Sequence, residues 1–143
     1  MPAGSPIIPC LRYKNAPAAV AFLCEAFGLT RHAVFADDAD PAIIHHAQLV
    51  LGDGMVMLGS DRPGEVKDAY QWKSPAEAGG VTQCICMIVA DVDAHAAQAR
   101  AAGARLIREP HDNEGYPGRG YDALDSEGNV WSFTSYDPWS DLS

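Results

Sequence analysis

The chain has 143 residues, of which 48% are hydrophobic and 20% are charged, an ordinary composition for a compact globular domain. A formal net charge of −9 argues against nucleic acid or an anionic membrane as a partner, because both favour basic patches. The sequence contains no run of about 18 apolar residues, so we predict no membrane span. The N-terminus does not resemble a signal peptide, and we therefore expect a cytoplasmic protein.

The first half of the chain predicts a strand, a helix and three further strands. The run IIPCLRY has strand character, and Asn15 is a suitable N-cap for the helix that follows. Pro17 fits the first helical turn and Gly28 fits the end of the helix. The runs LTRHAVF, AIIHHAQLVL and MVMLGS then predict three strands. One face of the helix carries an apolar stripe at helical spacing: Ala16, Val20, Leu23 and Phe27.

The second half of the chain repeats this order. VTQCICMIVA predicts a strand, and Asp91 caps a helix that Gly103 ends. ARLIREP, RGYDALD and NVWSFTSY predict three more strands. The number of residues from the N-cap to the glycine that ends the helix agrees within one residue between the two halves. The alternative explanation is a coincidence between two unrelated amphipathic helices. We therefore expect two copies of a strand–helix–strand–strand–strand module.

The two modules require a connection. Residues 61–80 are rich in proline, glycine and charge, so we predict a linker there. The first module then occupies residues 1–60, and the second module with the C-terminal tail occupies residues 81–143, the whole making one compact domain. Trp72 lies within this polar linker and is expected either to cover a cleft or a dimer partner or simply to pack.

The duplicated pattern resembles the vicinal oxygen chelate superfamily, which includes glyoxalase I, extradiol dioxygenases and bleomycin-resistance proteins. The resemblance is to its small bacterial glyoxalase-like branch, and it lies in PCLRYKNAPAAVAFLCEAFGL, HHAQLVLGDGMVML, VADVDAHAAQARAAGA and GRGYDALDSEGNVWSF. It implies an α+β fold in which two tandem βαβββ modules form a curved mixed sheet around a cleft. It also implies a homodimer. The last stretch departs from the branch's pattern at Ser126 and Asn129, where relatives carry proline and histidine.

The same resemblance allows a test for metal ligands. Metal-dependent members use four ligands, usually histidine or glutamate, from the first and last strand of each module. Hydrocarbon side chains cannot bind a hard divalent ion, and one thiol with one hydroxyl does not make a site. We therefore expect no metal and no other cofactor. The matching positions carry Ile8, Leu58 (or Met57 if the alignment slips by one residue), Cys84 and Ser132.

Alternation along the strands predicts which side chains face the cleft. In AIIHHAQLVL the more apolar face is assigned to the helices, and the face with His46 and Gln48 is assigned to the cleft. An error of one residue would exchange His45 with His46. Trp131 and Phe133 are assigned to the helices. The expected cleft wall is apolar with a few polar groups: Ile8, Cys10, Arg12, Ile44, His46, Gln48, Leu58, Cys84, Cys86, Ser132 and Thr134.

Each polar candidate has two interpretations. His46 could act as a general base or hydrogen-bond donor, or it could be a satisfied structural histidine. Gln48 can orient a ligand but cannot act as acid or base. Arg119, in the glycine-rich GYPGRGYD, could bind a carboxylate or phosphate, or could pair with Asp122 or Asp125.

The cysteines and remaining histidines are weaker candidates. None of the four cysteines forms a CxxC pair, so free buried thiols are expected rather than disulfides. Cys84 would need a nearby base to be a nucleophile. Ser132 either offers its hydroxyl to a ligand or fills space. His95 and His111 are expected at the surface.

Together these features predict a glyoxalase/bleomycin-resistance-like protein that lacks the usual metal ligands and binds a small organic molecule in its cleft. The alternative is a lyase or dioxygenase-type enzyme of the same superfamily, metal-free or with a rearranged metal site around His46. The sequence does not decide whether there is turnover. The residues predicted to bind the ligand are Arg12, His46, Gln48, Leu58, Cys84, Arg119 and Ser132.

Overall fold

The computed structural model describes residues 4–140. The first module comprises β1 (Cys10–Tyr13), α1 (Ala16–Phe27), β2 (Thr30–Ala36), β3 (Ile44–Leu51) and β4 (Gly54–Ser60). Its four strands form one sheet in the order β1-β4-β3-β2. β1 runs parallel to β4, whereas the other neighbours are antiparallel, so the sheet is mixed.

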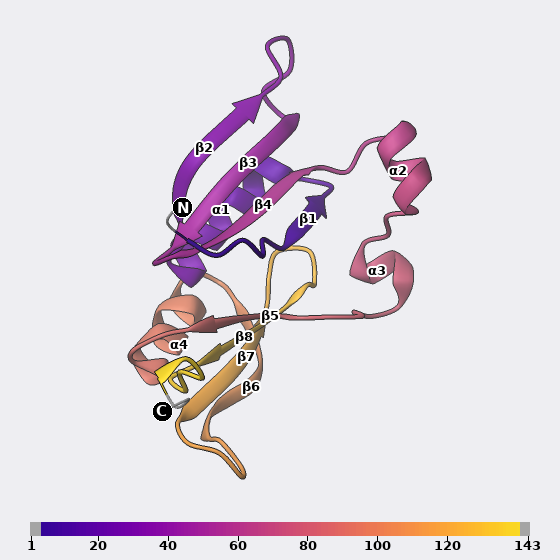
Figure 1. Ribbon diagram of the computed structural model, residues 1–143. Coiled ribbons are helices and arrows are strands. Elements are labelled where there is room, and N and C mark those ends of the chain that lie inside the picture. The colour runs from indigo at the N-terminus through magenta and orange to yellow at the C-terminus, as the bar shows by residue number, and fades with distance from the viewer. Residues whose placement is uncertain (1–3, 141–143) are drawn as a thin grey trace.

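The second module repeats the first. It comprises β5 (Ile85–Ile88), α4 (Val92–Ala101), β6 (Arg105–Asp112), β7 (Arg119–Leu124) and β8 (Val130–Thr134), and its sheet has the matching order β5-β8-β7-β6. The predicted α+β duplication is therefore confirmed, with two separate four-stranded sheets among residues 4–140. Figure 1 shows the modules one above the other.

The connection between the modules has more structure than its composition suggested. It contains two short helices, α2 (Glu65–Tyr70) and α3 (Pro75–Ala78), which lie to one side of β1 (Figure 1). The described residues include no helix long and apolar enough to cross a membrane.

The predicted helix ends are those observed. The Asn15 side chain accepts a hydrogen bond from the backbone N–H of Ala18, and Asp91 caps α4 in the same way through Ala94. Gly28 follows α1 with a φ of 78°, a left-handed conformation that glycine adopts without steric cost. These local signals fix where each helix begins and ends, and so which face it turns to its sheet.

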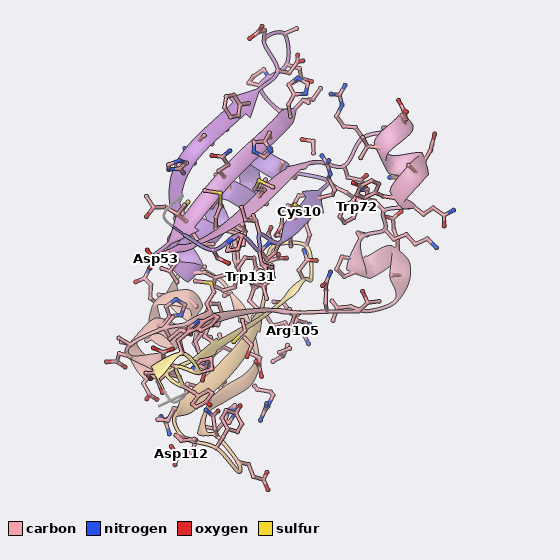
Figure 2. All side chains as sticks on the ribbon, viewed as in Figure 1. Cys10, Asp53, Trp72, Arg105, Asp112 and Trp131 are labelled. Carbon is pink, nitrogen blue, oxygen red and sulfur yellow. The ribbon has the colours of Figure 1, made fainter. Side chains whose placement is uncertain are left out.

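The two modules share one hydrophobic core. α1 packs on one face of the first sheet and also contacts α4. The ring of Phe27, at the end of α1, lies against Trp131 and Phe133 of β8, with centroid distances of 5.4 and 4.8 Å. Trp131 lies where the modules meet (Figure 2), and both β8 rings are fully buried, as alternation predicted.

Hydrogen bonds also join the modules. The turn between β7 and β8 reaches back to the first module, where Glu127 accepts bonds from the backbone N–H groups of Lys14 and Asn15 at 2.7 and 2.8 Å. On the helix side, His95 of α4 bonds the carbonyl of Phe27 at 2.9 Å. The expectation that His95 is a surface residue is wrong, because its ring is half-buried between α1 and β7.

Candidate functional site

Each sheet turns one face to its helix and leaves the other face open. On β1, Leu11 and Tyr13 belong to the core, whereas Cys10 and Arg12 lie on the open face. Strand pairing then defines a row across the open face of the first sheet. This row runs through four strands in the order Cys10, Met57, Gln48 and Ala33.

Leu58 does not belong to that open face, so this part of the predicted cleft wall is wrong. It is only 3% exposed and pairs with Leu11 and Ala47, which are both in the core. Met57, the stated alternative, takes the open position. The error is a shift of one residue along β4, and such a shift exchanges the two faces of a strand.

Ile44 was expected on the cleft wall; it is 4% exposed and belongs to the core, although it also lines a cavity with Arg12, while His45 beside it is exposed. The pairing of β2 with β3 shifts between Phe35 and Ala36, and this irregularity breaks the simple alternation along β3. Ile44 and Ala47 can therefore both be buried although they are three residues apart. His45 points to solvent and contacts Asp37 at 2.9 Å.

His46 and Gln48 lie together on the open face, as predicted. Nε2 of Gln48 is 3.1 Å from Nε2 of His46, and the Phe35 ring is 6.0 Å away. An amide nitrogen only donates, so Nε2 of His46 is the acceptor in this contact. The contact with Gln48 supports the interpretation of His46 as a structural histidine.

The open face of the second sheet carries the thiols and Ser132. Cys86 pairs with Ser132, and Ser132 pairs with Asp122 on the next strand. Partial desolvation of the sulfur raises the pKa of the Cys86 thiol, although the residue as a whole is exposed, and the neighbouring Cys84 and Asp122 raise it further, which disfavours the nucleophilic thiolate. The thiols are free, but Cys10, Cys84 and Cys86 are exposed, so the expectation that they are buried is wrong.

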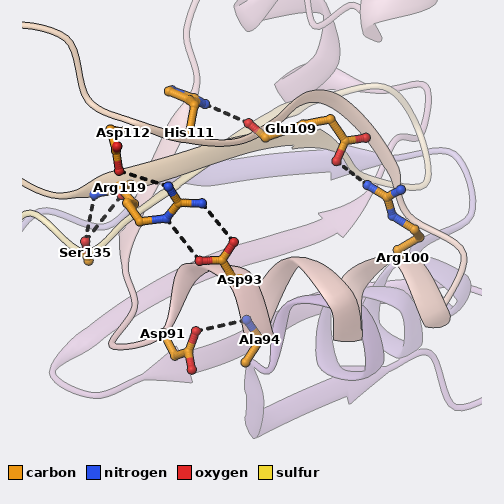
Figure 3. Close-up of polar contacts among 9 residues, drawn as sticks. All are labelled: Asp91, Asp93, Ala94, Arg100, Glu109, His111, Asp112, Arg119 and Ser135. Atoms are coloured by element: carbon orange, nitrogen blue, oxygen red, sulfur yellow. Dashed lines mark hydrogen bonds and ion pairs between the residues drawn. The ribbon is translucent and has the colours of Figure 1, made fainter.

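Arg119 takes part in an ion-pair network at the edge of the second module (Figure 3). Its guanidinium donates two hydrogen bonds to Asp93, at 3.0 and 2.9 Å, and one to Asp112 at 2.9 Å. These bonds raise the pKa of Arg119, and they lower that of Asp93. Arg119 is therefore a bridging residue, but its partners are neither of the two carboxylates that the sequence suggested.

One hollow lies between the two modules, beneath the linker. We call it the inter-module cavity; its volume is about 530 Å³, and β1, the linker, the start of β5 and β8 line it. Of the predicted ligand-binding residues, Arg12 and Cys84 line it. His46, Gln48, Leu58, Arg119 and Ser132 are not among its lining residues, which include Ile7, Ile8, Cys10, Arg12, Tyr70, Trp72, Lys73, Val81, Thr82, Cys84, Ile85 and Val130.

The linker makes an exposed contact with the first module beside this cavity. Ser74 and Glu77 form a capping box at the start of α3, and Glu77 pairs with Lys14 of the first module at 3.5 Å. The backbone bond from Ser74 is the largest cause of a Glu77 pKa lowered to about 2. The rings of Tyr70 and Trp72 stack with a centroid distance of 5.6 Å. Trp72 also lines the cavity, which agrees with one of its predicted roles.

A second cavity, of about 430 Å³, lies beside α2. Arg12 and Trp72 line both cavities, and Figure 2 shows Trp72 between the linker and the part of the first module that contains Cys10. Asp61, which also lines this α2 cavity, pairs with Lys67 at 3.0 Å.

The positions implied for metal ligands do not suit a metal ion. Corrected for the faces of the strands, they carry Ile8, Met57, Cys84 and Ser132. A hydrocarbon side chain has no lone pair, and a thioether is a poor ligand for a hard divalent ion. Among residues 4–140, no group of three or more His, Cys, Asp or Glu side chains is arranged to hold one.

Comparisons with known proteins agree with this architecture. The model of the Glyoxalase/Bleomycin resistance protein/Dioxygenase superfamily matches residues 7–133. The crystal structure of TioX from Micromonospora sp. ML1 is 32% identical, with 92% of this chain and 98% of that chain covered and a TM-score of 0.64. No curated protein matches the sequence.

Two further solved structures share the fold at low identity. A mutant of the fosfomycin resistance protein FosX from Listeria monocytogenes, in complex with Mn(II) and 1S,2S-dihydroxypropylphosphonic acid, is 13% identical over 100% of this chain and 98% of that chain, with a TM-score of 0.68. Glyoxalase I from Zea mays is 16% identical, with 89% of this chain and 43% of that chain covered and a TM-score of 0.64.

Proposed function

The chain belongs to the glyoxalase/bleomycin resistance protein/dioxygenase superfamily, and we propose that it binds a small organic molecule in the inter-module cavity without the help of a metal ion. The observation that carries this proposal is the cavity itself. Its volume of about 530 Å³ lies within the range of small-molecule sites, and its walls are mainly apolar with a few polar groups.

The position of the cavity adds support. Ile8 and Cys10 come from the approach to β1 and its start, and Cys84 comes from the approach to β5, so equivalent segments of the two modules meet around one hollow. The linker also lines the cavity, through Tyr70 and Trp72. A ligand there would contact both modules and the linker together, and its binding would therefore stabilise the whole fold.

We also propose that the protein acts as a homodimer. Large apolar side chains are exposed on the open faces of the sheets, among them Phe35 at 56% and Ile88 at 42%. A second copy of the chain packed against these faces would remove this apolar surface from water. Size-exclusion chromatography with light scattering measures the mass directly, and a monomer at micromolar concentration would contradict the proposal.

The enzymatic alternative rests on His46. This residue lies outside the lining of both cavities, and its Nε2 atom already has Gln48 as a partner. These observations give no support to turnover at His46, and we therefore propose ligand binding as the function.

A thermal-shift measurement tests the proposal. Purified protein is heated with a panel of small organic molecules, and separately with Ni²⁺, Zn²⁺, Mn²⁺ and Fe²⁺, each with and without a chelator. We expect some organic molecules to raise the melting temperature in a concentration-dependent way. Stabilisation by divalent metals alone would refute the proposal.

A pair of variants locates the site. Thr82 lines the inter-module cavity, so Thr82→Trp should fill part of it and abolish the organic shift. Thr30 is exposed on β2 and does not line the cavity, so Thr30→Trp should leave the shift unchanged. An equal shift in both variants would place the ligand elsewhere.

A further inference from the structure

The charge of the inter-module cavity is opposite to that of the protein. The chain carries 19 acidic and 10 basic residues, yet two cations, Arg12 and Lys73, line this cavity and no acidic residue does. The neighbouring α2 cavity differs, because Asp61 and Glu65 line it together with its cations. A positive hollow in a protein of net charge −9 requires an explanation.

Arg12 is half-buried, and it has neither an ion pair nor a hydrogen bond with any of the residues that the structure describes. Three other arginines, by contrast, each pair with a carboxylate: Arg100, Arg108 and Arg119. A half-buried cation has lost part of its hydration, and Arg12 has no ion pair with a described residue in return, although Asp61 and Glu65 line the α2 cavity with it. The guanidinium of Arg12 is thus available to an anion.

Gly59 provides the space that Arg12 occupies. Gly59 pairs with Arg12 across β1 and β4, and a Cβ atom on Gly59 would be only 2.6 Å from Nη1 of Arg12. The missing side chain therefore leaves room for the guanidinium of Arg12 beside Gly59.

Trp72 supplies a second donor without a partner. Its Nε1 atom is buried, and no acceptor within residues 4–140 takes its hydrogen bond. Buried donors of this kind are rare, because each has lost its bond to water without replacement. Since Trp72 and Arg12 line the same two cavities, both unsatisfied donors belong to one region.

We propose that the ligand of the inter-module cavity is a small organic anion, an oxyacid such as a carboxylate on an apolar body. Its oxygens accept hydrogen bonds from the Arg12 guanidinium and from Nε1 of Trp72. Its apolar body lies against the aliphatic wall, which includes Ile8, Ile85 and Val130. This inference rests on the proposed function and narrows it to one class of ligand.

Calorimetric titration with matched probes tests the inference. The first set is 2-naphthoate, 2-naphthalenemethanol and 2-naphthylmethylammonium, and the second is octanoate, octanol and octylammonium. Within a set the apolar body is constant and only the charge differs. We expect the carboxylate of at least one set to bind about tenfold or more tightly than its alcohol, and the ammonium to bind most weakly.

Variants assign the preference to residues. Arg12→Gln should abolish the preference for the carboxylate, whereas Arg12→Lys should keep part of it because the charge remains. Trp72→Phe keeps an aromatic ring but loses the donor, so it should weaken carboxylate binding several-fold and leave alcohol binding unchanged. Arg62→Gln is the matched control, since Arg62 lines only the α2 cavity and should not affect binding.

The outcomes distinguish failure of the inference about the anion from failure of the proposal that the cavity binds an organic molecule. If the alcohol or the ammonium binds as well as the carboxylate, or if Arg12→Gln binds like the wild type, the inference is wrong and the proposed function stands. If neither these probes nor the organic panel binds, both are wrong. Urea unfolding checks each variant, and should Arg12→Gln fail to fold, the comparison of Trp72→Phe with Arg62→Gln decides.

Discussion

The hydroxyl of Tyr13 donates a 2.6 Å hydrogen bond to the carboxylate of Asp125, which joins the end of β1 to the turn between β7 and β8. Asp125 is only 6% exposed, and it also accepts bonds from Nε1 of Trp131 and from the backbone N–H groups of Glu127 and Asn129. Burial and the nearby carboxylate of Asp125 raise the pKa of Tyr13, so its hydroxyl stays a donor. This carboxylate therefore links the two modules.

Removing the Tyr13 hydroxyl should weaken that link. We expect Tyr13→Phe to lower the free energy of unfolding by about 1–3 kcal/mol, because a buried charged acceptor loses a donor. Urea unfolding followed by tryptophan fluorescence measures the change. Tyr116→Phe is the control, since Tyr116 is 53% exposed, and equal stability of the two variants would show that the bond to Asp125 contributes nothing.

His95 should make stability depend on pH. Burial lowers the pKa of His95, while its ring bonds the Tyr121 hydroxyl and the Phe27 carbonyl. The folded state therefore binds a proton less readily than the unfolded state, whose histidine pKa is about 6.5. The stability that the neutral ring contributes is complete above this pH and is lost as the pH falls below it.

A pair of histidine variants isolates this effect. The difference in unfolding free energy between wild type and His95→Gln should stay constant above a pH of about 6.5 and shrink as the pH is lowered below it. His32 is exposed on β2, so His32→Gln should follow the wild-type curve. A pH-independent difference between wild type and His95→Gln would contradict the assignment.

The sequence predicted the duplicated fold because its signals are local. Asn15, Gly28 and Asp91 act through bonds and backbone conformations within a few residues, and these hold in both modules. The prediction placed the wrong residues of β4 on the open face, because the alternation of apolar and polar residues does not show which residue of a strand faces the core. The register shift between Phe35 and Ala36 buries Ile44 in the core, and nothing in the sequence around it signals that irregularity.

The candidate site was less predictable than the fold. The inter-module cavity depends on where the linker folds, and its two short helices are held by contacts such as the Glu77–Lys14 pair, which joins distant segments. Arg12 and Cys84 were predicted because they lie in or beside the first strand of a module. The partners of Arg119 were missed because Asp93 comes from α4, far away in the sequence.

The corrected orientation of β4 predicts opposite effects for two neighbours. Leu58→Ala should lower the free energy of unfolding by about 2–5 kcal/mol, because it opens a hole in the core. Met57→Ala removes a partly exposed side chain from the open face and should cost much less. The urea midpoints of the two variants provide the comparison, and a larger loss for Met57→Ala would show that β4 has the opposite orientation.

Arg119 should affect salt-sensitive stability and not ligand binding. Its partners Asp93 and Asp112 are exposed, and surface ion pairs of this kind contribute little and are screened by salt. We expect Arg119→Gln to lower the melting temperature slightly at low salt and not at high salt, with carboxylate binding unchanged. Scanning calorimetry gives the melting temperature and titration calorimetry gives the affinity for the carboxylate. A loss of carboxylate binding in Arg119→Gln would show that Arg119 takes part in the binding site.

The most direct test of metal-free binding is a crystal structure of the protein with a binding organic molecule, recorded with anomalous data above the absorption edges of Mn, Fe, Ni and Zn. We predict density for the organic molecule in the inter-module cavity, between Arg12 and Trp72, and no anomalous peak held by side chains of the chain. A transition-metal ion bound by those side chains in the cavity or on the open faces would contradict the account.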